Sequence, residues 1–266
     1  MSVLNKRNLV LNIAPNASNQ TRDEEVIASA LQNSPLGEEF YQQSDNSVTQ
    51  YLATELALVW SDFEQRISEV PVIKKLEAGK FTLADYKTLL LNLRQQVSEG
   101  GRWLSRAASS MENDLFPIRS ALIQHANDEH RDYLMLDKMY VGLGGSLENI
   151  QNTPRNIGSE IFTAYMFQQA SQTNPVQLFG AMFLIEGLGN KKAGAWAQML
   201  KDQLNLADED IIFMLYHSDN DVEHYERLKF ALSLPQITQE RAEAIVRMAR
   251  IVARLYCLQF EEMNNF

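Results

Sequence analysis

Residues 213–228, FMLYHSDNDVEHYERL, place polar side chains in the middle of a stripe that is otherwise apolar at helical spacing. His217, Asp221 and His224 follow one another at offsets of 0, 4 and 7 residues. At about 100° per residue these offsets fall within roughly 60° of one another, so the three side chains point the same way. If the apolar stripe faces the core, two imidazoles and one carboxylate enter it.

A second segment, QHANDEHRDYLML at 124–136, repeats the arrangement. His125, Glu129 and Asp132 again have offsets of 0, 4 and 7 and replace the middle of the apolar stripe of a helix predicted from about residue 114 to 140. His130 lies about 140° from His125 on such a helix, which favours a surface position. The two sets therefore predict two helices with matching polar interruptions.

A third predicted helix, from about residue 174 to 200, is apolar nearly all round in its first half, which is typical of a central buried helix. It contributes one conspicuous charge, Glu186. Up to seven such groups facing one interior would cost more than the roughly 5 to 15 kcal/mol net stability of a domain unless something compensates them. Metal ions do so best, and carboxylate-rich sets within helical bundles hold paired iron or manganese ions. The sequence thus predicts a metal centre.

The rest of the chain predicts an all-α fold of about seven to eight helices. The 266 residues include only 12 glycines and 7 prolines, which favours long uninterrupted elements. Thr82 is expected to cap a helix, and Gly100-Gly101 to break or kink it. Residues 1–45 are rich in Asn, Gln, Ser, Asp and Glu and are interpreted as a loosely packed N-terminal arm, followed by a helical domain over 46–266.

Composition limits the partners and the location. A net charge of −10 repels nucleic acid and anionic membranes, and the longest apolar stretch is far below the ~20 residues that cross a bilayer. The one cysteine, Cys257, cannot form an internal disulfide, so a cytoplasmic location is expected. We interpret Glu99 as a solvated helix-end residue rather than a further ligand or base, and Arg102, Lys191 and Lys192 as solvated rather than bound to a substrate carboxylate. Ordinary core packing is the favoured role of the aromatic residues near the polar sets, which are Tyr133, Tyr165, Tyr216, Trp103 and Trp196.

The HSDNDVEH and QHANDEHRDYLML segments, with VPVIKKLEAGKFTLADYKTLLLNL before them, resemble the haem-oxygenase-like diiron oxidases and oxygenases, relatives of the thiaminase and pyrroloquinoline-quinone synthase fold. The resemblance covers roughly residues 48–260. It implies a haem-oxygenase-like helical bundle with metal ligands at Glu186, His217, Asp221 and His224. Upstream the family often has Glu-x2-His, whereas this chain has Glu129-x2-Asp132. Either Asp132 ligates in place of that histidine, or His125 does, or the second metal is weakly held.

The resemblance also implies an activity. Two iron ions per chain, cycling between Fe(II) and Fe(III), would use O2 as co-substrate to oxidise a small molecule that resembles an amino acid or a fatty acid, in a homodimeric enzyme. Two alternatives stay open: a metal-free relative, either thiaminase-like or a cofactorless oxidase, and a non-catalytic metal-binding protein on the same fold. A thiaminase-like enzyme needs a nucleophilic cysteine in its pocket, and Cys257 lies in the last predicted helix, where core packing explains it better.

Overall fold

The computed structural model describes the backbone of residues 17–265 and the side chains of residues 24–265 other than 219–222. All regular structure in this part of the chain is helical, which confirms the predicted all-α class. The α-helices outnumber the seven or eight predicted because two long predicted helices are divided and because parts of the N-terminal segment and some short segments are also helical. They are α1 (Ala17–Asn33), α2 (Glu38–Gln42), α3 (Ser47–Glu69), α4 (Pro71–Glu77), α5 (Leu83–Ser109), α6 (Phe116–Glu129), α7 (Tyr133–Gly142), α8 (Leu147–Asn152), α9 (Ile157–Ala170), α10 (Phe179–Leu188), α11 (Gly194–Leu204), α12 (Ile212–Leu232) and α13 (Gln239–Glu261).

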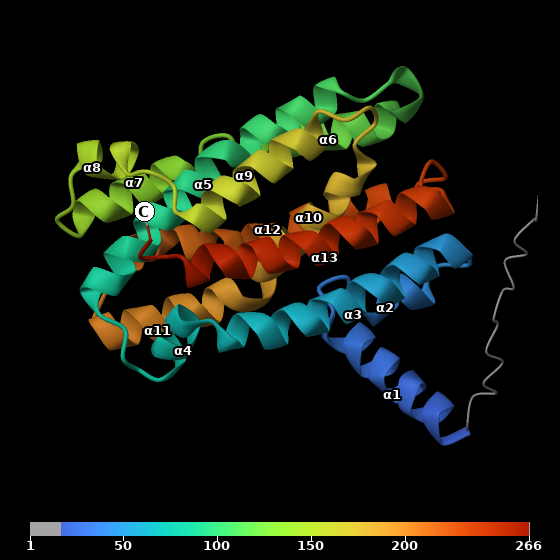
Figure 1. Cartoon of the computed structure of the whole chain (residues 1–266), viewed down its shortest axis with the longest axis horizontal. Helices are drawn as coiled ribbons and strands as arrows, with labels where there is room; N and C mark the ends of the chain where they lie inside the picture. Colours follow the sequence, from blue (N-terminus) through green and yellow to red (C-terminus); the bar gives the residue numbers. More distant parts are fainter. Residues whose placement is uncertain (1–16, 266) are drawn as a thin grey trace, which may run out of the picture.

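Helix α13 runs through the middle of the bundle, where it packs against α3, α9 and α10 (Figure 1). Glycines permit two of these contacts. A Cβ atom at Gly180 of α10 would lie 2.1 Å from the carbonyl oxygen of Ile245, and one at Gly158 of α9 would lie 2.6 Å from the backbone nitrogen of Gln259. Because any side chain would collide with backbone there, the two glycines allow α10 and α9 to approach α13 closely.

Helix α5 passes through Gly100-Gly101 without interruption, so the predicted break at this pair is wrong. Gly101 serves interhelical packing instead. A Cβ atom there would lie 2.8 Å from the Cα atom of His130, at the end of α6. The prediction that Thr82 caps α5 is confirmed: its hydroxyl accepts a hydrogen bond from the Asp85 backbone nitrogen at 3.2 Å.

The helix predicted over residues 114–140 is divided, contrary to the sequence-based expectation. A short 3₁₀ turn, η1 (Asn113–Leu115), precedes α6, and a turn at 130–132 separates α6 from α7. In that turn the Asp132 backbone nitrogen donates a hydrogen bond to the Glu129 carbonyl oxygen, three residues back, at 3.3 Å. The His130 ring nitrogen Nδ1 donates to the Asn127 carbonyl oxygen at 2.6 Å. A helix ends when a side chain competes for one of its carbonyl oxygens and when backbone hydrogen bonds span three residues instead of four.

The helix predicted over about 174–200 is also interrupted. It begins with a 3₁₀ turn, η2 (Val176–Leu178), continues as α10, and then widens into a π-helical segment, η3 (Gly189–Ala193), before α11. The π-helical segment packs against α12 and begins three residues after Glu186. Such segments inside α-helices occur frequently at functional sites.

The described part of the predicted N-terminal arm is mostly helical. Leu31, Leu36 and Phe40 are buried, and α1 and α2 pack on α3 (Figure 1). Residues 1–16 lie outside the described part, so the division into an arm and a domain stays a prediction. No helix within the described ranges has both the length and the apolar composition that a membrane span needs.

Candidate metal centre

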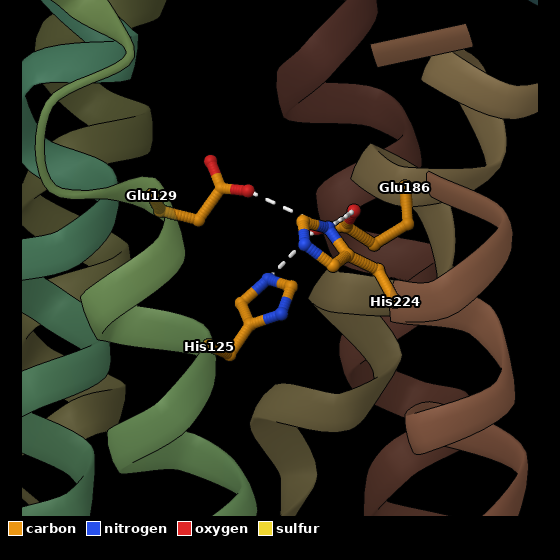
Figure 2. Close-up of side chains that lie close together, drawn as sticks. All are labelled: His125, Glu129, Glu186 and His224. Carbon is orange, nitrogen blue, oxygen red and sulfur yellow. Dashed lines mark hydrogen bonds and ion pairs between the residues drawn. The ribbon is translucent and has the colours of Figure 1, made fainter. Parts of the chain in front are cut away.

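Three helices bring four of the predicted ligands together. His125 and Glu129 lie one turn apart on α6, Glu186 comes from α10 and His224 from α12, and the four side chains converge between these helices (Figure 2). One nitrogen or oxygen atom of each lies within 4.8 Å of the corresponding atoms of the others. We call these residues the first group.

Glu129, Asp132 and His217 form a second group by the same criterion. The Nε2 atom of His217 lies 3.3 Å from Asp132 Oδ2, although α6 ends before Asp132. Glu129 belongs to both groups, so one carboxylate connects two clusters of potential ligands. Asp221, the seventh predicted ligand, has a side chain outside the described residues, so its role stays a prediction.

Glu186 organises the first group because each of its oxygens accepts from one imidazole. His125 Nε2 lies 3.0 Å from Oε1, and His224 Nδ1 lies 3.0 Å from Oε2. The two imidazole rings meet edge to face with centroids 4.6 Å apart. Both ring nitrogens are thereby directed to the Glu186 carboxylate.

Glu129 lacks such partners. Its Oε1 atom is buried and, within the described part of the chain, has no hydrogen-bond partner; His224 Nδ1 lies 3.5 Å from it. Burial, followed by repulsion from Glu186, raises the pKa of Glu129 to about 7. A buried carboxylate oxygen without a hydrogen-bond donor lowers the stability of the fold, so binding of a cation or a proton at this atom would be stabilising.

The other titratable groups show the same demand for positive charge. Burial alone would lower the pKa of His125, but the Glu186 carboxylate outweighs it and the pKa is raised. At His217 burial also acts to lower the pKa, and the hydrogen bond with Asp132 and the charge of Glu129 raise it. Burial acts to raise the pKa of Glu186, yet His125 and His224 hold it well below its ordinary value. The raised pKa values of His125 and His217 therefore favour bound protons beside these carboxylates, where a metal ion would supply positive charge instead.

This donor set fits two divalent ions. Imidazole nitrogen and carboxylate oxygen suit iron and manganese, and the set contains no thiolate of the kind a structural zinc site uses. With Asp221, the predicted ligands include four carboxylates, whose charge equals that of two divalent cations. Shared carboxylates and histidines from facing helices are also how helical bundles hold paired metal ions.

Residues outside the two groups orient the imidazoles. His217 Nδ1 lies 2.8 Å from the Phe213 carbonyl oxygen, which fixes this nitrogen as the donor and leaves Nε2 for Asp132 or a metal. Asp128 Oδ2 lies 3.8 Å from His224 Nε2 and 2.6 Å from Arg227 Nη2. Asp128 therefore lies between a guanidinium and the far side of a predicted ligand. Neither Asp128 nor Arg227 was identified from the sequence, although both lie within a few residues of the polar sets.

We expect Asp128→Asn to weaken iron binding by about tenfold, the lower end of the 10- to 100-fold typical of carboxylates beside a ligating histidine, because Asp128 faces His224 Nε2 at 3.8 Å, an ion-pair distance longer than a hydrogen bond. Anaerobic titration with Fe(II) measures the change. Asp62→Asn is the matched control, since Asp62 is also paired with an arginine but lies on α3. Equal affinities in the two variants would contradict a role for Asp128 in positioning His224.

A cavity of about 120 Å³ opens onto both groups. His125, Glu129, Glu186 and His217 contribute to its wall, and the remainder is mostly aliphatic and aromatic side chains from α4, α5 and α10 to α13. Of the five aromatic residues near the predicted site, Trp103 and Trp196 line it, whereas Tyr133, Tyr165 and Tyr216 are not among its lining residues.

Several other candidates are placed elsewhere. Glu99 is buried, not solvated as expected, and is paired with Arg102 and Arg155 outside both groups. Lys192 pairs with Glu64, and neither Arg102, Lys191 nor Lys192 lines the cavity. His130 is exposed, as predicted.

Cys257 is buried outside the cavity wall, and burial raises its pKa to about 12. Such a thiol is almost entirely protonated near neutral pH and is a poor nucleophile. Core packing therefore accounts for it, as the sequence indicates.

Solved structures with the same fold support the architecture. A domain of unknown function with a haem-oxygenase-like fold from Shewanella denitrificans is 19% identical, with a TM-score of 0.75, covering 83% of this chain and 93% of its own. A TenA homologue from Pseudomonas syringae is 12% identical, with a TM-score of 0.65, covering 82% and 92%. Haem oxygenase-1 from the cyanobacterium Synechocystis, in complex with haem, is 20% identical, with a TM-score of 0.63, covering 80% and 92%. These similarities confirm the haem-oxygenase-like fold.

The sequence comparisons bear on the family. A comparison with the curated proteins finds no match. Residues 90–257 match a family described as iron-containing redox enzymes, and this span includes all seven predicted ligands. Because the match covers more than half of a chain whose fold is haem-oxygenase-like, the protein belongs to the family of iron-containing redox enzymes.

Proposed function

We propose that this protein is a non-haem diiron oxidase or oxygenase that uses O2 to oxidise a small organic metabolite. The observation that carries the proposal is the position of Glu129, a buried carboxylate shared by two groups of ligand atoms. The match to iron-containing redox enzymes supports the choice of iron over manganese.

The residues divide the work of holding two ions. His125, Glu186 and His224 would hold one ion, Asp132 and His217 the other together with Asp221, and Glu129 would bridge them. Two ferrous ions held there would supply two of the four electrons that reduce O2, and the bound organic substrate would supply the other two as it is oxidised. Anionic carboxylates favour the more highly charged ferric state, and neutral imidazoles moderate that preference.

The cavity supports an organic substrate of small size. Its apolar wall excludes water from the face of the cluster formed by Glu129 and His217, which protects a reactive oxidant from side reactions. Its volume of about 120 Å³ is well below the roughly 300 to 1,000 Å³ of pockets that enclose drug-sized ligands. A haem is larger than such ligands, which favours a non-haem centre.

The proposal is tested by loading the metal-free protein with Fe(II) under anaerobic conditions, counting the iron and admitting O2 while visible absorption is recorded. We expect about two irons per chain, as in other carboxylate-bridged bundle sites, and an O2-dependent transient absorption. His217→Ala is expected to reduce the iron content, and His130→Ala, which removes a nearby exposed imidazole, is the matched control. Less than one iron per chain, unchanged by His217→Ala, would sink the proposal.

A further inference from the structure

One part of the cavity wall is polar although it carries no predicted ligand. Gln96 of α5 and Tyr256 of α13 both line the cavity, whereas the predicted ligands come from α6, α10, α12 and the turn at 130–132. Gln96 Nε2 donates to the Tyr256 hydroxyl at 3.3 Å, a long hydrogen bond. Among the described lining residues, Gln96 is the one with a side-chain amide and Tyr256 the one with a hydroxyl, and neither is a predicted metal ligand.

Gln96 has unused hydrogen-bonding capacity. Its side chain is half-buried, and the bond to Tyr256 uses one of its two N–H donors. Its Oε1 atom accepts no hydrogen bond from any residue that the structure describes. A bound molecule that both donates and accepts would pair with this amide and would replace the water it otherwise needs.

Charge restricts what else the cavity can hold. Among the described residues, its wall contains no lysine or arginine, and its only carboxylates and imidazoles, Glu129, Glu186, His125 and His217, belong to the metal centre. A carboxylate or ammonium group held by Gln96 would meet no opposite charge outside the metal centre among the described lining residues, and an unpaired charge is costly in an apolar surrounding. The Gln96 side of the cavity therefore favours an uncharged group.

The volume sets a size. About 120 Å³ is slightly less than the roughly 150 Å³ of an engineered apolar cavity that binds benzene, a molecule with six heavy atoms. The cavity thus accommodates a segment of about that size, surrounded by aliphatic and aromatic side chains.

We infer that the cavity binds an uncharged aliphatic segment of about six heavy atoms whose hydroxyl or primary amide group is held by Gln96, which makes Gln96 a specificity-determining residue. That this segment is the substrate rests on the proposed function. Its aliphatic carbons then lie in the apolar part of the cavity, and its polar group is held by Gln96, which is not one of the predicted metal ligands.

Binding is tested on the full-length metal-free protein by fluorescence titration, since Trp103 and Trp196 line the cavity. The probes are 1-pentanol, pentanamide, pentanoate, pentylammonium and 1-chloropentane. We expect 1-pentanol and pentanamide to bind more tightly than the two charged probes. Gln96→Leu is expected to weaken their binding by about three- to tenfold, as the loss of one neutral hydrogen bond does, and to leave 1-chloropentane unaffected.

Gln65→Leu, on the exposed face of α3, is the control and should change none of these affinities. Gln96→Met replaces Gln96→Leu if the latter fails to fold, and the ranking of the five probes on the unaltered protein needs no variant. The inference would be overturned if the ratio of 1-pentanol affinity to 1-chloropentane affinity were the same in the Gln96→Leu variant as in the unaltered protein. It would also be overturned if the unaltered protein bound none of the probes. The same holds if pentanoate binds the Fe(II)-loaded protein more tightly than 1-pentanol does, because the polar group would then lie at the metals. Because the main titrations contain no iron, a failure of iron binding does not affect them.

Discussion

Glu129→Gln is expected to reduce iron binding from about two ions per chain to fewer than one and to lower O2-dependent activity by about 100-fold or more. The reason is geometric. Glu129 is the one described residue common to both groups of ligand atoms, so its substitution removes a charged donor from both ions at once. The glutamine side chain has nearly the same shape but only one oxygen and no charge. Iron content after anaerobic loading, measured together with O2 consumption, provides the test.

Glu99→Gln is the matched control, because Glu99 is also a buried glutamate but is paired with Arg102 and Arg155 outside both groups. Its iron content should equal that of the unaltered protein. Two irons bound with unaltered affinity by the Glu129→Gln variant would show that Glu129 does not bridge the ions.

Much of the candidate site could be predicted from the sequence because it depends on helical periodicity. The offsets of 0, 4 and 7 predict that His217 and His224 share one face of α12. His224 lies in the first group and His217 in the second. The isolated charge of Glu186 in an apolar helix was an equally direct signal, since that helix is the one held against α13 by Gly180.

Other features depend on contacts between helices that are distant in sequence. The same periodicity placed Asp132 within a continuous helix; the helix ends at Glu129, yet the side chain still reaches His217 across the bundle. Gly101 indicated a break by its local propensity, whereas its effect is to admit His130. The sequence predicts a solvated Glu99 because it places this residue at a helix end, whereas α5 continues past it and the distant Arg155 pairs with its buried carboxylate. Local rules describe one helix, and these features are set by pairs of helices.

The metal-free protein is expected to be less stable at pH 8 than at pH 5.5. When metal is bound, this pH dependence of stability should reverse. The pKa of Glu129 is raised to about 7 by burial and by Glu186, so between its ordinary value of 4.5 and 7 the folded chain holds a proton that the unfolded chain releases. Stability therefore falls as the pH rises through this range, and the raised pKa values of His125 and His217 act in the same direction at higher pH. Glu186 acts oppositely, because its lowered pKa removes stability only below its ordinary value of 4.5.

Between pH 5.5 and pH 8 the difference attributable to Glu129 is about 2 kcal/mol, which corresponds to about 4 to 8 °C in Tm for a chain of this size. Metal reverses the slope because metal ions compete with protons for these same atoms, and their apparent affinity rises with pH. Thermal denaturation under anaerobic conditions, with and without Fe(II), should give a stabilisation by iron that is larger at pH 8 than at pH 5.5. In the metal-free Glu129→Gln variant the fall in Tm from pH 5.5 to pH 8 should shrink, since the amide does not titrate. If the metal-free variant loses as much stability over this range as the unaltered protein, the protonation of Glu129 is not what links stability to pH.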